Sequence, residues 1–226
     1  KNLKERSKMS LKSVICEPQG QHKATVIWLH GLGDSSDGFA PIVPQLEMPN
    51  EIGVKFIFPH APIRAVTINN GMEMRAWYDI VSFDLDKRAD ETGVRESSAQ
   101  VAEIIEQEMA QGIEANKIIL AGFSQGGVIA LHLAPRLKHK LAGVMALSTY
   151  MCVPQKFNDE AIQKDLTVLM AHGSQDEVVP MFAGKQALDV MQSAGLEVTW
   201  HDYPMGHQVC GEEVMVIRNW LIEQLQ

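Results

Sequence analysis

The chain has 226 residues, 46% of them hydrophobic, and its 28 acidic residues against 20 basic ones give a formal net charge of -8. This length and apolar content suffice for a large core within one α/β domain. The negative charge would repel phosphate backbones and anionic lipid surfaces, and no apolar run is long enough for a membrane span, so we expect no nucleic-acid partner and no stable membrane insertion.

The chain opens on a basic, polar stretch that has no counterpart elsewhere in the sequence. Residues 1–9 are predicted to be a polar leader, either disordered or an artificial extension. Residues 10–226 are predicted to form a single domain, because no repeat, low-complexity tract or Gly/Ser-rich linker marks a boundary within them.

Strand-like and helix-like segments then alternate along the chain. Runs with several consecutive apolar positions, typical of strands buried on both faces, fall at 11–17, 25–30, 54–59, 117–121, 141–147, 167–171 and 197–203. Apolar residues recur at steps of three and four, as in helices, at 94–111, 127–137, 181–194 and 212–225. The alternation predicts an α/β fold with a mostly parallel central sheet of about seven strands and helices on both faces.

The first candidate for a functional turn is His30-Gly-Leu-Gly-Asp34, at the end of the strand-like run 25–30. A glycine-rich turn at this position can expose backbone N–H groups toward a reactive crevice, where an oxyanion hole belongs. We assign one donor to the backbone N–H of Leu32 and the second to that of Gln125. His30 is expected to pin the loop by a hydrogen bond.

Residues 60–88 form the one long segment without clear periodicity. Met72, Met74, Trp77 and Tyr78 make it too apolar for disorder, and long loops inside compact domains are usually functional. We expect the segment to roof or line a pocket in which Met72, Met74 and Trp77 contact substrate. An ordinary core position is the alternative for Trp77.

The run Gly122-Phe-Ser-Gln-Gly126 carries the clearest chemical signal of the chain. It joins the strand-like run 117–121 to the helix-like run 127–137, which is the strand-turn-helix setting of a nucleophile elbow. Glycines on both sides allow a sharp reversal and a close approach of strand and helix. Ser124 is therefore the predicted nucleophile, with its hydroxyl facing solvent and a helix N-terminus behind it.

Two residues qualify as partners of Ser124 because each follows directly after a strand. In open parallel sheets the reactive crevice lies beyond the carboxyl ends of the strands. Asp176 follows the run 167–171, and His207 follows the run 197–203. The order serine, aspartate, histidine is the one that this architecture uses. Asp176 and His207 are the predicted acid and base, with Glu177 as the alternative acid.

Cysteines and histidines give no sign of a metal or disulfide framework. Cys16, Cys152 and Cys210 are an odd set without Cys-x-x-Cys spacing, which favours a reducing, cytoplasmic location. The eight histidines are scattered without neighbouring acids or thiols at ligand spacing, so no metal site is predicted.

These motifs together resemble the acyl-protein thioesterase, lysophospholipase and carboxylesterase family of small α/β-hydrolases. The matching pieces are Leu29 to Asp34, Phe58 to Pro62, Val66-Thr67 with Asn69, Met74 to Asp79, Gly122 to Gly127, Ala171 to Asp176, Val179-Pro180 and Gly206-His207. The resemblance implies an α/β-hydrolase fold without a large cap domain and without a cofactor. It also implies the triad Ser124, Asp176 and His207, the oxyanion donors Leu32 and Gln125, and a flexible loop at 66–77 that shapes an acyl channel.

Two departures from the family pattern fall where substrate selection would be decided. Tyr150 stands where eukaryotic relatives usually have tryptophan, and Met72-Glu-Met-Arg75 replaces a less charged stretch. Both resemble bacterial carboxylesterase members more than protein depalmitoylases. Tyr150 and Phe182 complete the expected substrate contacts.

The leading hypothesis is a serine hydrolase that cleaves carboxylic esters or thioesters of short to medium acyl chains through an acyl-serine intermediate. The expected partners are a small acyl ester, a thioester, a lysolipid or an acylated protein, with a weak homodimer through the apolar loop near Met72 and Trp77. The alternatives are a lysophospholipase or acyl-protein thioesterase and, in a different class, a non-catalytic α/β-hydrolase binding protein. The complete set of reactive residues argues against the last hypothesis.

Overall fold

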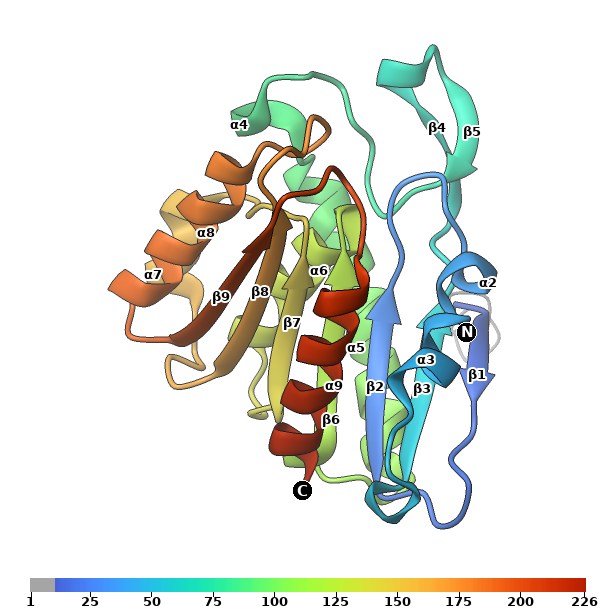
Figure 1. Cartoon of the computed structure of the whole chain (residues 1–226). Coiled ribbons are helices and arrows are strands. Elements are labelled where there is room, and N and C mark those ends of the chain that lie inside the picture. The colour runs from blue at the N-terminus through green and yellow to red at the C-terminus, as the bar shows by residue number, and fades with distance from the viewer. Residues whose placement is uncertain (1–10) are drawn as a thin grey trace, which may run out of the picture.

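A seven-stranded sheet forms the centre of the computed structural model, which describes residues 11–226 (Figure 1). The predicted leader, residues 1–9, lies outside the described part. The strand order is β1-β3-β2-β6-β7-β8-β9, and only the edge pair β1 and β3 is antiparallel. The predicted mostly parallel sheet of about seven strands is confirmed. Its strands are β1 (Ser13–Cys16), β2 (Ala24–Leu29), β3 (Val54–Pro59), β6 (Ile118–Phe123), β7 (Gly143–Leu147), β8 (Thr167–Gly173) and β9 (Glu197–Tyr203).

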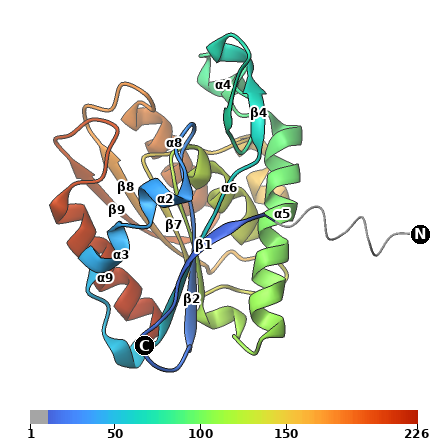
Figure 2. The same cartoon turned by 90° about the vertical axis from the view of Figure 1, so that its right-hand side faces the viewer.

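Helices cover both faces of the sheet, as predicted (Figure 2). One face carries α5 (Glu91–Ala110), α6 (Gln125–Leu133), α7 (Phe157–Glu160) and α8 (Met181–Ser193). The other carries α2 (Ser36–Phe39), α3 (Ile42–Leu46) and α9 (Gly211–Leu225). Short 3-10 turns occupy Asn50–Ile52, Thr67–Asn69, Ala115–Lys117, Ala134–Arg136 and Pro154–Lys156. The predicted helix 127–137 ends earlier, at Leu133, because Pro135 offers no N–H to continue it.

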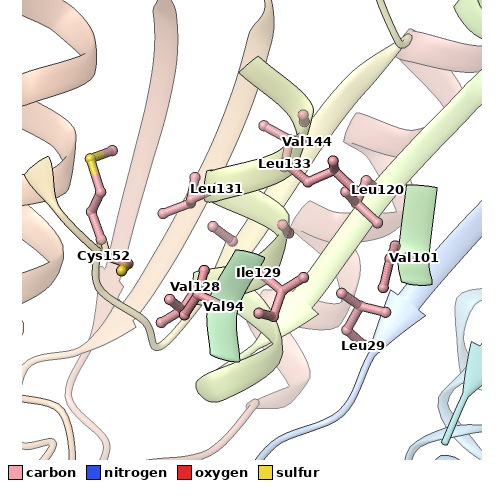
Figure 3. Close-up of a cluster of buried hydrophobic side chains, with 14 of the residues drawn as sticks. Leu29, Val94, Val101, Leu120, Val128, Ile129, Leu131, Leu133, Val144 and Cys152 are labelled. Atoms are coloured by element: carbon pink, nitrogen blue, oxygen red, sulfur yellow. The ribbon is translucent and has the colours of Figure 1, made fainter. Parts of the chain in front are cut away.

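The two helical layers explain why the central strands are apolar at consecutive positions. Alternate side chains of one strand point to opposite faces, and here both faces are covered. Leu29 of β2 and Leu120 of β6 pack beside Val101 of α5 and Ile129 of α6 (Figure 3). Trp28, the neighbour of Leu29, belongs to the core under α3 and α9 instead. Every residue of β2, β3 and β7 is buried.

The segment 60–88 contains strands and a helix that its sequence pattern does not predict. Its strands β4 (Ile63–Val66) and β5 (Met72–Arg75) form an antiparallel hairpin, and α4 (Leu85–Arg88) follows. Figures 1 and 2 show the hairpin beyond the end toward which the parallel strands run. Val66 is the one buried residue of the two strands, and Ile63 and Met72 are exposed, so the hairpin has too few buried positions to produce a readable alternation. The weak homodimer expected from this segment stays a prediction.

No helix within residues 11–226 combines the length and the apolar character needed to cross a membrane.

The passage from β6 to α6 is packed tightly against the end of β2. A Cβ atom on Gly126 would lie 2.2 Å from the carbonyl oxygen of Leu29 and 2.6 Å from that of His30. A Cβ atom on Gly122 would lie 2.2 Å from the carbonyl oxygen of Gly126. In both cases the atoms that the Cβ would overlap belong to the backbone, which cannot turn aside as a side chain can. Only glycine therefore fits at these two positions without moving the strand or the helix.

We therefore expect Gly126→Ala to lower the free energy of unfolding by about 2 kcal/mol or more, because the added methyl group overlaps a fixed carbonyl group. Urea denaturation followed by circular dichroism measures the change. Gly211→Ala is the matched control, since a Cβ atom at this exposed helix start meets no atom within 4 Å. Equal stability of the two variants would contradict the close packing.

Helix α9 begins with a carboxyl group inside the protein. Glu213 is buried in its first turn, whereas the adjacent Glu212 is exposed. Burial raises the pKa of Glu213 from 4.5 to about 7, and the backbone N–H of Cys210 offsets only part of this effect. The folded protein therefore keeps a proton on Glu213 at pH values where the unfolded chain has already lost it.

Because the pKa of Glu213 is raised in the folded state, the stabilising contribution of this one group decreases as the pH increases from about 4.5 to about 7, and the decrease then levels off. Glu213→Gln abolishes this decrease. The difference in the free energy of unfolding, variant minus wild type, should increase by about 2 kcal/mol between about pH 5 and about pH 8. Urea denaturation at both pH values tests this, with Glu212→Gln as the control that shows no such difference.

Candidate active site

Ser124 occupies the single-residue turn between β6 and α6 in an unusual backbone conformation. Its φ of 55° and ψ of -118° lie in a region that residues with a side chain rarely adopt. Its N–H donates to the carbonyl of Leu147 (2.9 Å), and its own carbonyl accepts from the hydroxyl of Thr149 (2.6 Å). These bonds to β7 and the residues after it hold the strained turn. Ser124 is only 8% exposed, so its hydroxyl does not face open solvent, which differs from our prediction; it lies against the ring of His207 instead.

Ser124, His207 and Asp176 form one hydrogen-bonded row. The hydroxyl of Ser124 lies 2.9 Å from Nε2 of His207, and Nδ1 of His207 lies 2.7 Å from Oδ2 of Asp176. Asp176 comes from the loop after β8 and His207 from the loop after β9, so the structure brings the three predicted side chains together at the carboxyl end of the sheet. The alternative acid, Glu177, is exposed.

Asp176 is held as a carboxylate by its hydrogen bonds. Burial acts to raise its pKa, but the bond from His207 and those from the backbone N–H groups of Val178 and Val179 outweigh burial, and the pKa falls below its usual value. Nearby, Nε2 of the buried His172 donates to the carbonyl of Val179 (2.7 Å). Burial lowers the pKa of His172, so this ring stays neutral beside the loop.

The loop after β2 lies directly against Ser124. A Cβ atom on Gly31 would lie 3.4 Å from the Cβ atom of Ser124. His30 holds this loop as predicted: its Nδ1–H donates to the carbonyl of Gly31 (2.7 Å), and its Nε2 accepts from the N–H of Ala61 (3.0 Å). Burial lowers the pKa of His30, in keeping with a neutral ring that donates at one nitrogen and accepts at the other.

The two backbone groups predicted as oxyanion donors come from different elements. Leu32 follows Gly31 in the loop after β2 and is half-buried. Gln125 is the first residue of α6, where backbone N–H groups have no acceptor within the helix. Both N–H groups therefore belong to segments that adjoin Ser124. Their role as oxyanion donors stays a proposal.

The side chain of Gln125 has a role that the sequence did not reveal. Its Oε1 accepts from the backbone N–H of Trp77 (2.7 Å), and its Nε2 donates to the carbonyl of Tyr78 (2.8 Å). The indole N–H of Trp77 donates to the carbonyl of His30 (2.8 Å). Trp77 is fully buried, so its expected contact with substrate gives way to the core position considered as the alternative. The one feature of the sequence that could have indicated these bonds is that the residue after the predicted nucleophile, Gln125, has a polar side chain.

The other predicted substrate contacts are spread around the site. Met72 of β5 is 65% exposed and Phe182 at the start of α8 is 67% exposed, so both lie at the surface on elements that Figure 1 shows on opposite sides. Met74 is half-buried, and its sulfur lies 3.6 Å from Nδ2 of Asn69. Tyr150 is buried, and its hydroxyl lies 2.7 Å from that of Tyr78.

Within the described chain, no group of three or more histidine, cysteine, aspartate or glutamate side chains is arranged to hold a metal ion.

Known proteins resemble this chain over nearly its whole length. The family model described as Phospholipase/Carboxylesterase matches residues 11–224. Acyl-protein thioesterase 1 of Neurospora crassa is 40% identical over 216 residues, which cover 91% of this chain and 88% of the relative. Acyl-protein thioesterase 1 of Cryptococcus neoformans is 39% identical, covering 96% of this chain and 99% of the relative.

Solved structures show the same architecture. SOBER1 of Arabidopsis thaliana has a TM-score of 0.85 and 31% identity, covering 90% of this chain and 100% of that chain. Acyl-protein thioesterase 2 of Zea mays has a TM-score of 0.84 and 28% identity, covering 95% of this chain and 99% of that chain. The fold is thus the predicted α/β-hydrolase fold, and the chain belongs to the phospholipase/carboxylesterase family.

Proposed function

We propose that this protein is a serine hydrolase that cleaves carboxylic esters or thioesters of short to medium acyl chains through an acyl-serine intermediate. The observation that carries the proposal is the hydrogen-bonded row of Ser124, His207 and Asp176 at the strained turn between β6 and α6. Membership of the phospholipase/carboxylesterase family supports it.

In this proposal His207 is the general base. A neutral serine hydroxyl is a poor nucleophile, so Nε2 of His207 accepts the proton of Ser124 while the serine oxygen attacks the acyl carbon. Asp176 accepts from Nδ1–H, which fixes the ring tautomer and stabilises the imidazolium that forms. The lowered pKa of Asp176 supports this role, because the carboxylate stays ionised at neutral pH.

The backbone N–H groups of Leu32 and Gln125 are the proposed oxyanion donors. Negative charge moves to the carbonyl oxygen as the acyl carbon becomes tetrahedral, and a donor already in place typically stabilises that state by about 3 to 4 kcal/mol. The approach of Gly31 to Ser124 and the position of Gln125 at the start of α6 support this assignment.

The reaction then proceeds in two halves. The tetrahedral intermediate collapses, the alcohol or thiol leaves with the proton held by His207, and the acyl group stays on Ser124 as an ester. Water attacks this ester while His207 again accepts a proton, and the second collapse releases the acid and restores the hydroxyl of Ser124. Every group used is a side chain or backbone group of the chain, so the proposal includes no cofactor.

Ser124→Ala removes the nucleophile but keeps the backbone bonds of the turn. We expect the hydrolysis of p-nitrophenyl butanoate to fall by at least about a thousandfold, together with the loss of labelling by a fluorophosphonate probe. The unfolding transition should stay close to that of the wild type. Ser193→Ala, at an exposed position in the last turn of α8, is the matched control that keeps full activity. A Ser124→Ala protein of undiminished activity would refute the proposal.

A second candidate within the same chemistry is acyl-protein thioesterase activity. Relatives of 39% to 40% identity that span most of this chain carry that name, which favours a protein-borne thioester as the substrate. Lysophospholipase activity is the other alternative, supported by the description of the family.

The leaving group separates these candidates. A thiol has a lower pKa than an alcohol and leaves more readily, so we expect a peptide carrying S-octanoyl-cysteine to be cleaved faster than the same peptide carrying O-octanoyl-serine. The comparison is made at equal concentrations by mass spectrometry, with Ser124→Ala as the blank, and includes octanoyl lysophosphatidylcholine. Turnover of the lysolipid with both peptides left intact would favour the lysophospholipase instead.

A further inference from the structure

A cavity of about 500 Å³ lies between α4, α8 and the residues that follow β7. This volume is within the range of about 300 to 1,000 Å³ that is typical of small-ligand pockets. Its apolar lining includes Leu85, Ala89, Cys152 and Val190, and its polar lining includes Asp86 and Gln186. Neither Ser124 nor His207 lines the cavity, so the cavity is separate from the hydrogen-bonded row of Ser124, His207 and Asp176.

One wall of the cavity is formed by Tyr150, which is paired with a second tyrosine. The hydroxyls of Tyr150 and Tyr78 lie 2.7 Å apart, and both side chains are buried. Burial raises the pKa of Tyr150 to about 12 and that of Tyr78 well above its usual value, so both phenols are neutral. The pair is thus a neutral hydrogen bond between two buried side chains, and a buried hydroxyl without a partner is costly.

Both tyrosines adjoin the turn that holds Ser124. The carbonyl of Tyr78 accepts from the side chain of Gln125, the residue after Ser124 (2.8 Å). Thr149, the residue before Tyr150, donates its hydroxyl to the carbonyl of Ser124 (2.6 Å). The pair is therefore tied to the nucleophile turn on one side, while Tyr150 faces the cavity on the other.

Arg88 holds the ring of Tyr150 in place. Its guanidinium lies 5.9 Å from the centroid of the Tyr150 ring and donates to the carbonyls of Phe83 (3.1 Å) and Val178 (2.7 Å). The ring of Tyr150 is thus fixed by a hydrogen bond at its hydroxyl and by a cation over its face.

We propose that the Tyr78–Tyr150 pair sets the acyl-chain length by closing the way from Ser124 to this cavity. The inference rests on the proposed esterase function. A short acyl chain on Ser124 ends before the pair and leaves it intact. A longer chain reaches the cavity only when the ring of Tyr150 turns and the buried hydrogen bond between the hydroxyls breaks.

The test is the ratio of kcat/KM for p-nitrophenyl dodecanoate to that for p-nitrophenyl butanoate. Tyr150→Ala removes the wall, and we expect the ratio to rise by roughly tenfold or more, since each methylene in an apolar pocket adds binding energy. Tyr78→Phe removes only the hydrogen bond, and we expect a rise of roughly threefold, the factor that such a bond represents. Tyr203→Phe is the matched control: this buried tyrosine belongs to the opposite core, and its variant keeps the wild-type ratio.

Filling the cavity supplies the second arm of the test. Val190→Phe in the Tyr150→Ala background is expected to return the ratio toward the wild-type value, because the larger side chain occupies the space that the long chain would use. A ratio that stays raised would show that the chain goes elsewhere and would overturn the proposal. Circular dichroism verifies that each variant is folded, and Tyr78→Phe carries the test by itself if Tyr150→Ala is not.

Failure of this inference differs from failure of the proposed function. Wild-type ratios in both Tyr150→Ala and Tyr78→Phe, with butanoate still hydrolysed, would overturn the role of the tyrosine pair alone. A wild-type protein that neither hydrolyses butanoate nor forms an adduct at Ser124 with a fluorophosphonate would overturn both.

Discussion

The strained turn at Ser124 is the constraint on which the rest of the site depends. A positive φ at a residue with a side chain is costly, and it persists because hydrogen bonds to Leu147 and Thr149 fix the backbone. The turn also requires the helix to begin immediately, which the absence of a Cβ atom at Gly126 allows. In that position the hydroxyl of Ser124 lies 2.9 Å from Nε2 of His207, and the first N–H of α6 belongs to the next residue, Gln125.

Two buried histidines hold loops around the site, and burial lowers the pKa of each. His30 and His172 are buried with lowered pKa values, so each acts as a neutral group that donates one hydrogen bond and holds a loop. Asp176 differs because it accepts three hydrogen bonds, and its pKa falls in spite of burial. The carboxylate of Asp176, next to the neutral ring of His172, places negative charge behind His207, which suits the role of general base proposed for His207.

Much of this arrangement followed from the sequence because it depends on position along the chain. Consecutive apolar residues located the buried strands, and residues placed after strand ends located Ser124, Asp176 and His207. The hairpin β4–β5 did not follow, since only one of its eight residues is buried and its strands carry no periodic signal. The bonds of Gln125 to the segment at Trp77, and the pairing of Tyr78 with Tyr150, join loops far apart in the chain. No local pattern encodes such contacts, because they arise only when the loops meet over the sheet.

The order of the strands along the chain has a consequence for biosynthesis. Ser124 follows β6, which pairs with strands made before and after it, whereas His207 follows β9 at the far edge of the sheet. During translation the first strands and the serine leave the ribosome well ahead of the histidine. On the proposed mechanism, a nascent chain therefore carries the serine without its base, which arrives only when the outermost strand, β9, has docked beside β8.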